Sequence, residues 1–218
     1  MAAASRPCVR ANRAGLSVLE LLQLPRRSVH YLPGSQPAVF YFVDDRAGGI
    51  LINTPRFSVE TLSALMRIAP PKFIFLPSRF GARDVAEWRA ASGAKVLAGA
   101  EDVSAIQGPV DEPIDGGVRF YGRLDFLALS GRTRGTVALR SREEPGIIFF
   151  GPALEHGDWP RLQPHDDDDS WENRLIGALG LREIEFEYAF CDNYVHTTSR
   201  YGPGADEAVR AELAAVLA

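Results

Sequence analysis

The stretch SGRTRGTVAL, residues 130–139, places an arginine at the centre of a glycine-flanked turn between two apolar segments. LDFLAL (124–129) precedes the turn, TVALRS (136–141) follows it, and both are typical of β-strands. Gly131 and Gly135 favour a tight loop, because glycine adopts backbone conformations that other residues resist. A loop of this form presents one side chain, and in this sequence that side chain is Arg132.

The composition indicates a single globular domain with a sizeable core. The chain has 218 residues, of which 46% are hydrophobic, and a formal net charge of −4. We expect no nucleic-acid partner, which would need a clustered basic face, and no membrane partner, because no apolar run approaches about 18 residues. Cys8 and Cys191 are too far apart for a Cys-x-x-Cys motif, and a reducing, cytoplasmic location is expected.

The N-terminal segment differs from the rest of the chain in its charge. Residues 1–28 contain five arginines and a single acidic residue, Glu20. An arginine-rich start with few acids can be an organelle transit peptide, but we favour a frayed cytosolic N-terminus, which has the same composition. We therefore divide the chain into a basic N-terminal arm, residues 1–28, and one domain, residues 29–218.

The order of predicted elements favours an α/β fold in four layers. A hairpin is predicted over 38–54, a helix capped by Ser58, a buried strand over 72–78, a helix over 84–92 and a strand over 95–100. Further strands follow from 118, and then a helix over 170–179, a last strand and a helix over 206–217. Two groups of strands, each with its own helices, predict an αββα sandwich in which two sheets pack face to face.

Several stretches resemble the motifs of the metallo-β-lactamase-fold hydrolases, a four-layer αββα family. The resemblance extends from about residue 29 to the C-terminus. It rests on GGILINTP (48–55), KFIFLPSRFGARDVAEW (72–88), SGRTRGTVAL (130–139), IIFFGPAL (147–154) and EFEYAFCDN (185–193).

The resemblance also shows which side chains are missing. In that family these motifs carry the ligands of zinc or iron, which activates a water molecule for hydrolysis. The residues at or near those positions in this sequence are Ser78, Phe80, Asp84, Val85, Arg132, Pro152 and Asn193. One carboxylate cannot hold a catalytic ion, so the resemblance implies a degenerate member without the dinuclear metal site and without a cofactor.

Four arginines are the strongest remaining candidates for a binding site. Arg79 and Arg83 come from one loop, Arg132 and Arg134 come from another, and the resemblance implies that both loops face one cleft. Guanidinium groups in a shared cleft favour a small carboxylate or phosphate ligand. The alternative is that they pair with local acids, in particular Arg132 with Asp84.

The acidic run HDDDD, residues 165–169, is predicted to be a solvated loop, because it lacks the ligand spacing of a calcium site.

The sequence thus predicts a pseudoenzyme with a binding or scaffolding role, with a homodimer among its expected states. One alternative is a hydrolase with a relocated, non-metal site, in which Ser78 is the nucleophile, His196 the base and Asp192 its orienting acid. Another is a regulatory protein that interacts through its surface and not through its cleft.

Overall fold

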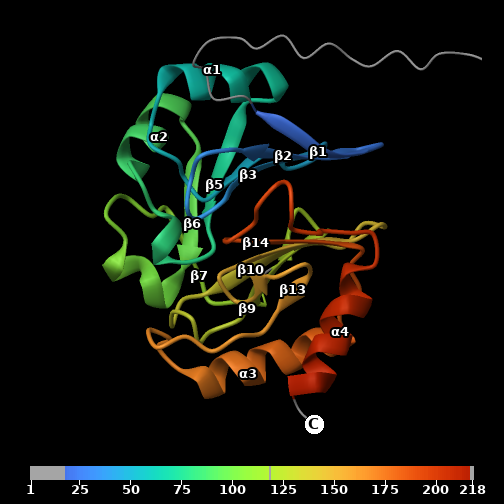
Figure 1. Ribbon diagram of the computed structural model, residues 1–218. Coiled ribbons are helices and arrows are strands. Elements are labelled where there is room, and N and C mark those ends of the chain that lie inside the picture. Colours follow the sequence, from blue (N-terminus) through green and yellow to red (C-terminus); the bar gives the residue numbers. More distant parts are fainter. Residues whose placement is uncertain (1–17, 118, 217–218) are drawn as a thin grey trace, which may run out of the picture.

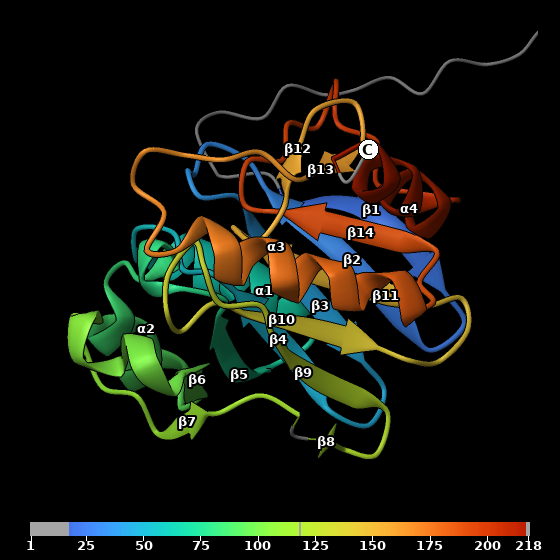
Figure 2. The same cartoon turned by 90° about the horizontal axis from the view of Figure 1, so that it is seen from below.

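Two β-sheets packed face to face form the centre of the molecule, and helices cover the outer face of each (Figure 1). This computed structural model describes residues 18–117 and 119–216. The view from below shows α3 crossing the outer face of the second sheet (Figure 2). The predicted αββα four-layer architecture is confirmed.

The first sheet has seven strands in the order β1-β2-β3-β4-β5-β6-β7. The strands from β1 to β4 are antiparallel and those from β4 to β7 are parallel. Their bounds are β1 (Leu19–Leu24), β2 (Arg27–Leu32), β3 (Val39–Asp44), β4 (Gly48–Ile52), β5 (Pro71–Leu76), β6 (Lys95–Gly99) and β7 (Glu112–Ile114).

The sheet begins earlier than the sequence indicated. Residues 19–24 form β1 and pair with β2, so the second part of the predicted basic arm belongs to the sheet. The first part of that arm, residues 1–17, lies outside the described residues, and so does Cys8.

Helices α1 (Val59–Ile68) and α2 (Val85–Ser92) cover the outer face of this sheet. Ser58 caps α1 as predicted, since its Oγ accepts a hydrogen bond from Thr61 N at 3.1 Å. The short 3-10 helices η1 (Arg79–Gly81) and η2 (Ala100–Ala105) follow β5 and β6.

The second sheet has five strands in the order β14-β11-β10-β9-β8, in which β11 and β14 are parallel. Helices α3 (Trp171–Gly180) and α4 (Ala205–Val216) cover its outer face. The strands are β8 (Arg119–Phe120), β9 (Leu124–Ala128), β10 (Val137–Ser141), β11 (Ile147–Gly151) and β14 (Tyr188–Cys191), and the connection between β11 and β14 also contains β12 (Glu155–His156), β13 (Pro160–Arg161) and the 3-10 helix η3 (Leu181–Glu183).

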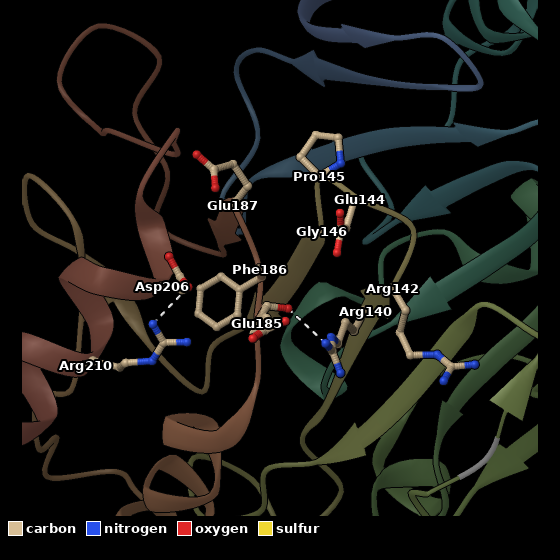
Figure 3. Close-up of a pocket in the computed structure, with 10 residues that line it drawn as sticks. All are labelled: Arg140, Arg142, Glu144, Pro145, Gly146, Glu185, Phe186, Glu187, Asp206 and Arg210. Atoms are coloured by element: carbon tan, nitrogen blue, oxygen red, sulfur yellow. Dashed lines mark hydrogen bonds and ion pairs between the residues drawn. The ribbon is translucent and has the colours of Figure 1, made fainter.

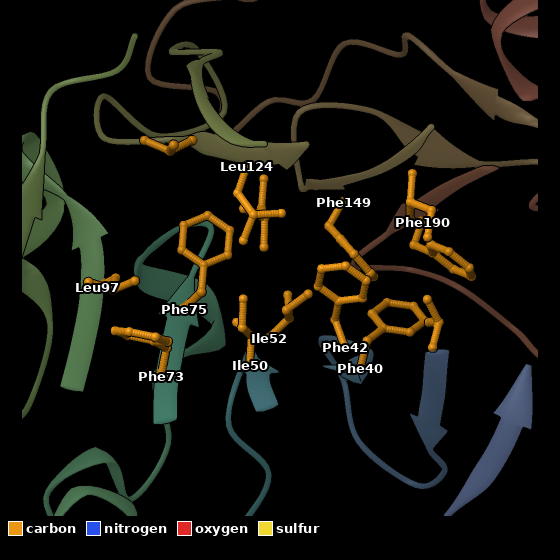
Figure 4. Packing of buried hydrophobic residues seen from close by; sticks show 14 of the residues in the cluster. Phe40, Phe42, Ile50, Ile52, Phe73, Phe75, Leu97, Leu124, Phe149 and Phe190 are labelled. Carbon is orange, nitrogen blue, oxygen red and sulfur yellow. The ribbon is translucent and has the colours of Figure 1, made fainter. Parts of the chain in front are cut away.

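The alternation of side chains along the strands explains why the sheets have two buried faces. Phe40 and Phe42 of β3 point between the sheets and contact Phe149 of β11, with ring centroids 5.9 and 5.5 Å apart (Figure 4). Tyr41, between them in the sequence, lies in the outer cluster with Trp88 of α2. Within the described residues, no helix combines the length and the apolar character needed to cross a membrane.

Candidate ligand-binding site

A pocket of about 210 Å³ lies where β11 and β14 end, at the position that the resemblance assigns to the metal site. Four of the seven former ligand positions line it: Phe80, Arg132, Pro152 and Asn193. Leu154, Glu155 and Asp192 contribute to the same wall. The fold therefore brings the motifs together as expected, although the side chains they present differ from those of a metallo-hydrolase.

The other three former ligand positions lie elsewhere. Ser78 is fully buried, and its Oγ accepts a hydrogen bond from Phe80 N at the start of η1. Val85 belongs to the core beneath α2. Asp84 accepts a hydrogen bond from Phe57 N at 2.9 Å and lines a separate pocket, so the predicted Arg132–Asp84 pair is wrong.

The donor groups in the pocket do not fit the metal that the fold family implies. A guanidinium has no free lone pair, and the side chains of Phe80 and Pro152 have no donor atom. Asn193 uses both ends of its amide on the backbone of His156, accepting from N at 2.6 Å and donating to O at 3.1 Å. Among residues 18–117 and 119–216, no group of three or more His, Cys, Asp or Glu side chains is placed to hold a metal ion.

Asp102 holds the glycine loop in place. Its wholly buried carboxylate accepts hydrogen bonds from Thr133 Oγ1 at 2.6 Å, Gly135 N at 3.1 Å and Arg79 N at 2.8 Å. A Cβ on Gly131, whose φ is +138°, would lie 2.4 Å from the backbone nitrogen of Arg174. The loop therefore keeps its form because an internal carboxylate and close backbone contacts maintain it.

Arg132 lines the pocket and pairs with the acidic run. Its two terminal nitrogens donate to Asp167 Oδ1 and Oδ2 at 2.6 and 3.1 Å, and its guanidinium lies 5.1 Å from the centre of the Phe80 ring. The Arg132 side chain is 13% exposed and that of Asp167 is 70% exposed. Arg132 Nη1 also lies 3.4 Å from Oδ1 of the buried Asp168. The prediction that the arginines pair with acids is thus confirmed for Arg132, but with a partner 35 residues away.

The three other candidate arginines do not line this pocket. Arg79 pairs with Asp169 at 3.0 Å and with Asp102 at 3.5 Å. The Arg83 side chain donates to Gln36 O at 2.6 Å, and the residue borders the separate pocket of Asp84. Arg134 lines a further small pocket, and its backbone nitrogen donates to Asp169. The cleft at the former metal position is therefore lined by one arginine and not by four.

The run 165–169 is a loop in which Asp166, Asp167 and Asp169 are exposed, as predicted, but the side chain of Asp168 is buried. Asp168 is buried against Arg174 of α3, with a distance of 3.0 Å between Asp168 Oδ1 and Arg174 Nη1. Arg174 also donates to the carbonyl oxygens of Ala153 at 2.9 Å and Pro152 at 3.2 Å, and Pro152 lines the pocket. The acidic run therefore joins the glycine loop, η1 and α3 through three different arginines.

Asp192 is the buried acid of the pocket. Asn53 Nδ2 donates to its Oδ1 at 2.7 Å, whereas its Oδ2 is buried without a hydrogen-bond partner among the described residues. Burial raises the pKa of the Asp192 carboxyl to about 7; the charge of Glu155 also raises it, while the Asn53 hydrogen bond and Arg132 oppose the shift.

His156 is buried beside the same strand end, and neither ring nitrogen has a hydrogen-bond partner among the described residues. Burial lowers the pKa of this imidazole to about 4, so it is neutral at pH 7.

Solved structures of metallo-β-lactamases superpose on most of the chain. The MIM-2 metallo-β-lactamase has 14% sequence identity and a TM-score of 0.64, covering 88% of each chain. A motif variant of the Cronobacter sakazakii metallo-β-lactamase has 14% identity and a TM-score of 0.65, covering 92% of this chain and 96% of that chain. The chain has the metallo-β-lactamase fold.

The likeness is one of fold, because the sequence identities are low. A metallo-β-lactamase from Staphylococcus aureus subsp. aureus COL has a TM-score of 0.67 at 10% identity, covering 88% of this chain and 63% of that chain. The sequence matches no protein-family model and no curated protein sequence.

The alternative hydrolase site is not assembled on this metallo-β-lactamase fold. Ser78 Oγ is buried at the start of η1, and the hydrogen-bonded partner of Asp192 is Asn53. His196 Nδ1 instead lies 3.4 Å from the hydroxyl of Tyr194, and its ring stacks on Tyr31. These contacts separate the three predicted members of the triad into three different local environments.

A wider pocket of about 580 Å³ lies at the opposite ends of β11 and β14, between the β10–β11 turn and α4 (Figure 3). Several of its charged side chains contact groups of the protein itself. Arg210 pairs with Asp206 at 3.0 Å, and Arg140 donates to Glu185 O at 2.9 Å. Because these charged groups already pair within the protein, the wider pocket is a weaker candidate for ligand binding than the pocket at the former metal position.

Proposed function

We propose that this protein is a non-hydrolytic member of its fold that binds a small anionic molecule, a carboxylate or phosphate, in the pocket lined by Arg132. The observation that carries the proposal is the guanidinium group at a position where the fold's hydrolases present a metal ligand. The loop around it is fixed by Asp102, and the Phe80 ring lies against its face. A fixed guanidinium in a pocket is a good receptor for a planar anion.

The ion pair with Asp167 does not prevent such a ligand from binding. Because the Asp167 side chain is 70% exposed, the pair contributes at most about 1 kcal/mol. A ligand anion that enters the pocket can therefore exchange for the Asp167 carboxylate at the guanidinium. The predicted homodimer and the cytoplasmic location stay predictions beside this proposal.

Binding is tested by calorimetry and thermal shift with a panel of small carboxylates and inorganic phosphate. We expect at least one of these anions to raise Tm, Arg132→Gln to abolish the shift, and Asp167→Asn to strengthen binding about threefold because it removes the competing carboxylate. Arg134→Gln is the matched control, since Arg134 shares the loop but lines a different pocket. The proposal is wrong if no anion binds the wild type or Asp167→Asn, or if Arg134→Gln loses binding as Arg132→Gln does.

A further inference from the structure

We propose that the ligand is a small amino or hydroxy carboxylate, whose carboxylate meets Arg132 while its ammonium or hydroxyl group donates to the acids of the same pocket. This inference rests on the proposed function and specifies the chemical class of the ligand. Its basis is that the pocket presents acidic side chains as well as a guanidinium.

The first observation is the free acceptor on Asp192. The residue lines the pocket and is 9% exposed, and only its Oδ1 is hydrogen-bonded, to Asn53. Its Oδ2 is buried without a partner among the described residues. Less than 1 Å² of this oxygen is exposed, so a ligand donor reaches it once the Asp192 side chain turns toward the pocket. Because a buried acceptor left unpaired costs about 1–3 kcal/mol, a donor then gains more here than it would at an exposed carboxylate.

The second observation is the charge balance of the pocket lining. Arg132 is its one cationic side chain, and two aspartates already offset that charge: Asp167 from the exposed side, and the buried Asp168, whose Oδ1 lies 3.4 Å from Arg132 Nη1. Asp192 and Glu155 are both acids, and Glu155 Oε1 contacts His165 Nε2. A simple anion would be attracted by Arg132 and repelled by the two acids, whereas a molecule with a donor group beside its carboxylate satisfies both.

The third observation is the size and apolar part of the pocket. Its volume of about 210 Å³ is below the range of about 300–1,000 Å³ that holds drug-sized ligands. Pro37, Pro152 and Leu154 supply the apolar surface. These dimensions suit a short side chain attached to the carbon that carries the amino or hydroxy group.

The test is calorimetric titration with probes that differ by one functional group: alanine, lactate, propionate and ethylamine. We expect alanine or lactate to bind at least tenfold more tightly than propionate. Asp192→Asn and, as a second variant, Glu155→Gln should reduce that preference at least threefold, while propionate binds as tightly as to the wild type or more tightly, because an acid that repels it has been neutralised. Glu144→Gln, which alters an acid of the wider pocket, is the matched control and should behave as the wild type.

The possible results separate this inference from the proposed function. If propionate binds as tightly as alanine and lactate, the pocket recognises a carboxylate alone, so the inference fails and the proposed function stands. If ethylamine binds and propionate does not, and Arg132→Gln has no effect, the pocket is a cation site and both fail. Absence of binding by all four probes, with phosphate binding in the earlier panel, also overturns the inference alone.

Discussion

Arg132 provides a fixed positive charge at a position where the fold's hydrolases carry a group that binds a cation. The loop that carries it keeps its form because Thr133 and Gly135 donate to the buried carboxylate of Asp102. The same loop geometry therefore presents an opposite chemistry: a donor for anions replaces an acceptor for metals. At the residue scale, the Arg132 guanidinium is one of the side chains that set the chemistry of the pocket.

The ionisation of Asp192 gives a prediction about stability and pH. Since burial raises its pKa from 3.8 to about 7, the folded state holds a proton that the unfolded state releases, and stability is lost as the pH rises from about 4 to about 7. Asp192→Asn removes this loss and can still accept the hydrogen bond from Asn53. The free energy of unfolding of the variant, relative to wild type, should increase by about 1.4 kcal/mol per pH unit in this window.

His156 provides a control in which stability changes with pH in the opposite direction. Its pKa is lowered from 6.5 to about 4, so its contribution to stability is lost as the pH falls through this range. His156→Phe should therefore gain stability relative to wild type on acidification, and the two variants should show opposite slopes in urea denaturation from pH 4.5 to 6.5. A pH-independent difference for Asp192→Asn would show that the carboxyl titrates with an ordinary pKa.

At the scale of elements, the acidic run 165–169 connects the glycine loop, η1 and α3. Its aspartates bind the glycine loop through Arg132, η1 through Arg79 and α3 through Arg174. Arg174 is also nearly fully buried and donates to the carbonyl oxygens of Ala153 and of Pro152, a residue of the pocket lining after β11. The pocket is therefore shaped by side chains that do not line it.

Replacement of Arg174 tests this connection. Arg174→Met keeps much of the volume but removes the nearer cation of the buried Asp168, which keeps only Arg132 Nη1 at 3.4 Å, so we expect a loss of about 3 kcal/mol in the free energy of unfolding. Asp167→Asn, which alters an exposed partner of the same segment, should cost less than about 1 kcal/mol. Urea denaturation measures both, and a loss below about 1 kcal/mol for Arg174→Met as well would show that the segment contributes little to the folded state.

The fold was predictable from local patterns, whereas most of the site was not. Alternation along β3 and the Ser58 cap of α1 follow from neighbouring residues, and these expectations are confirmed. The pairs that build the site join residues far apart in sequence: Thr133 lies 31 residues from Asp102, and Arg79 lies 90 residues from Asp169. No local pattern indicates which of several acids an arginine meets, so the run 165–169 resembled a solvated loop.

At the scale of the whole molecule, the fold brings the former ligand positions together, but the side chains there lack the usual donor atoms for a metal. This combination leads to a prediction about metal content. The sheets and glycine loop hold the former ligand positions near one another, but an aromatic ring, a guanidinium, a pyrrolidine and a fully hydrogen-bonded amide occupy four of them. Asp84, the one carboxylate among the seven, lies at a different pocket. Zinc and iron sites need several imidazole, thiolate or carboxylate ligands around one centre.

We therefore expect protein purified without chelator to contain less than about 0.1 equivalent of zinc, iron or manganese, and EDTA to leave its Tm unchanged, because no binding energy of a metal contributes to the folded state. Elemental analysis and thermal denaturation measure the two quantities, and the Asp192→Asn variant provides the comparison for adventitious binding at the buried acid. One or two equivalents of metal in the wild type, lost in that variant together with Tm, would show that the pocket assembles a metal site from a donor set other than that of the fold's hydrolases.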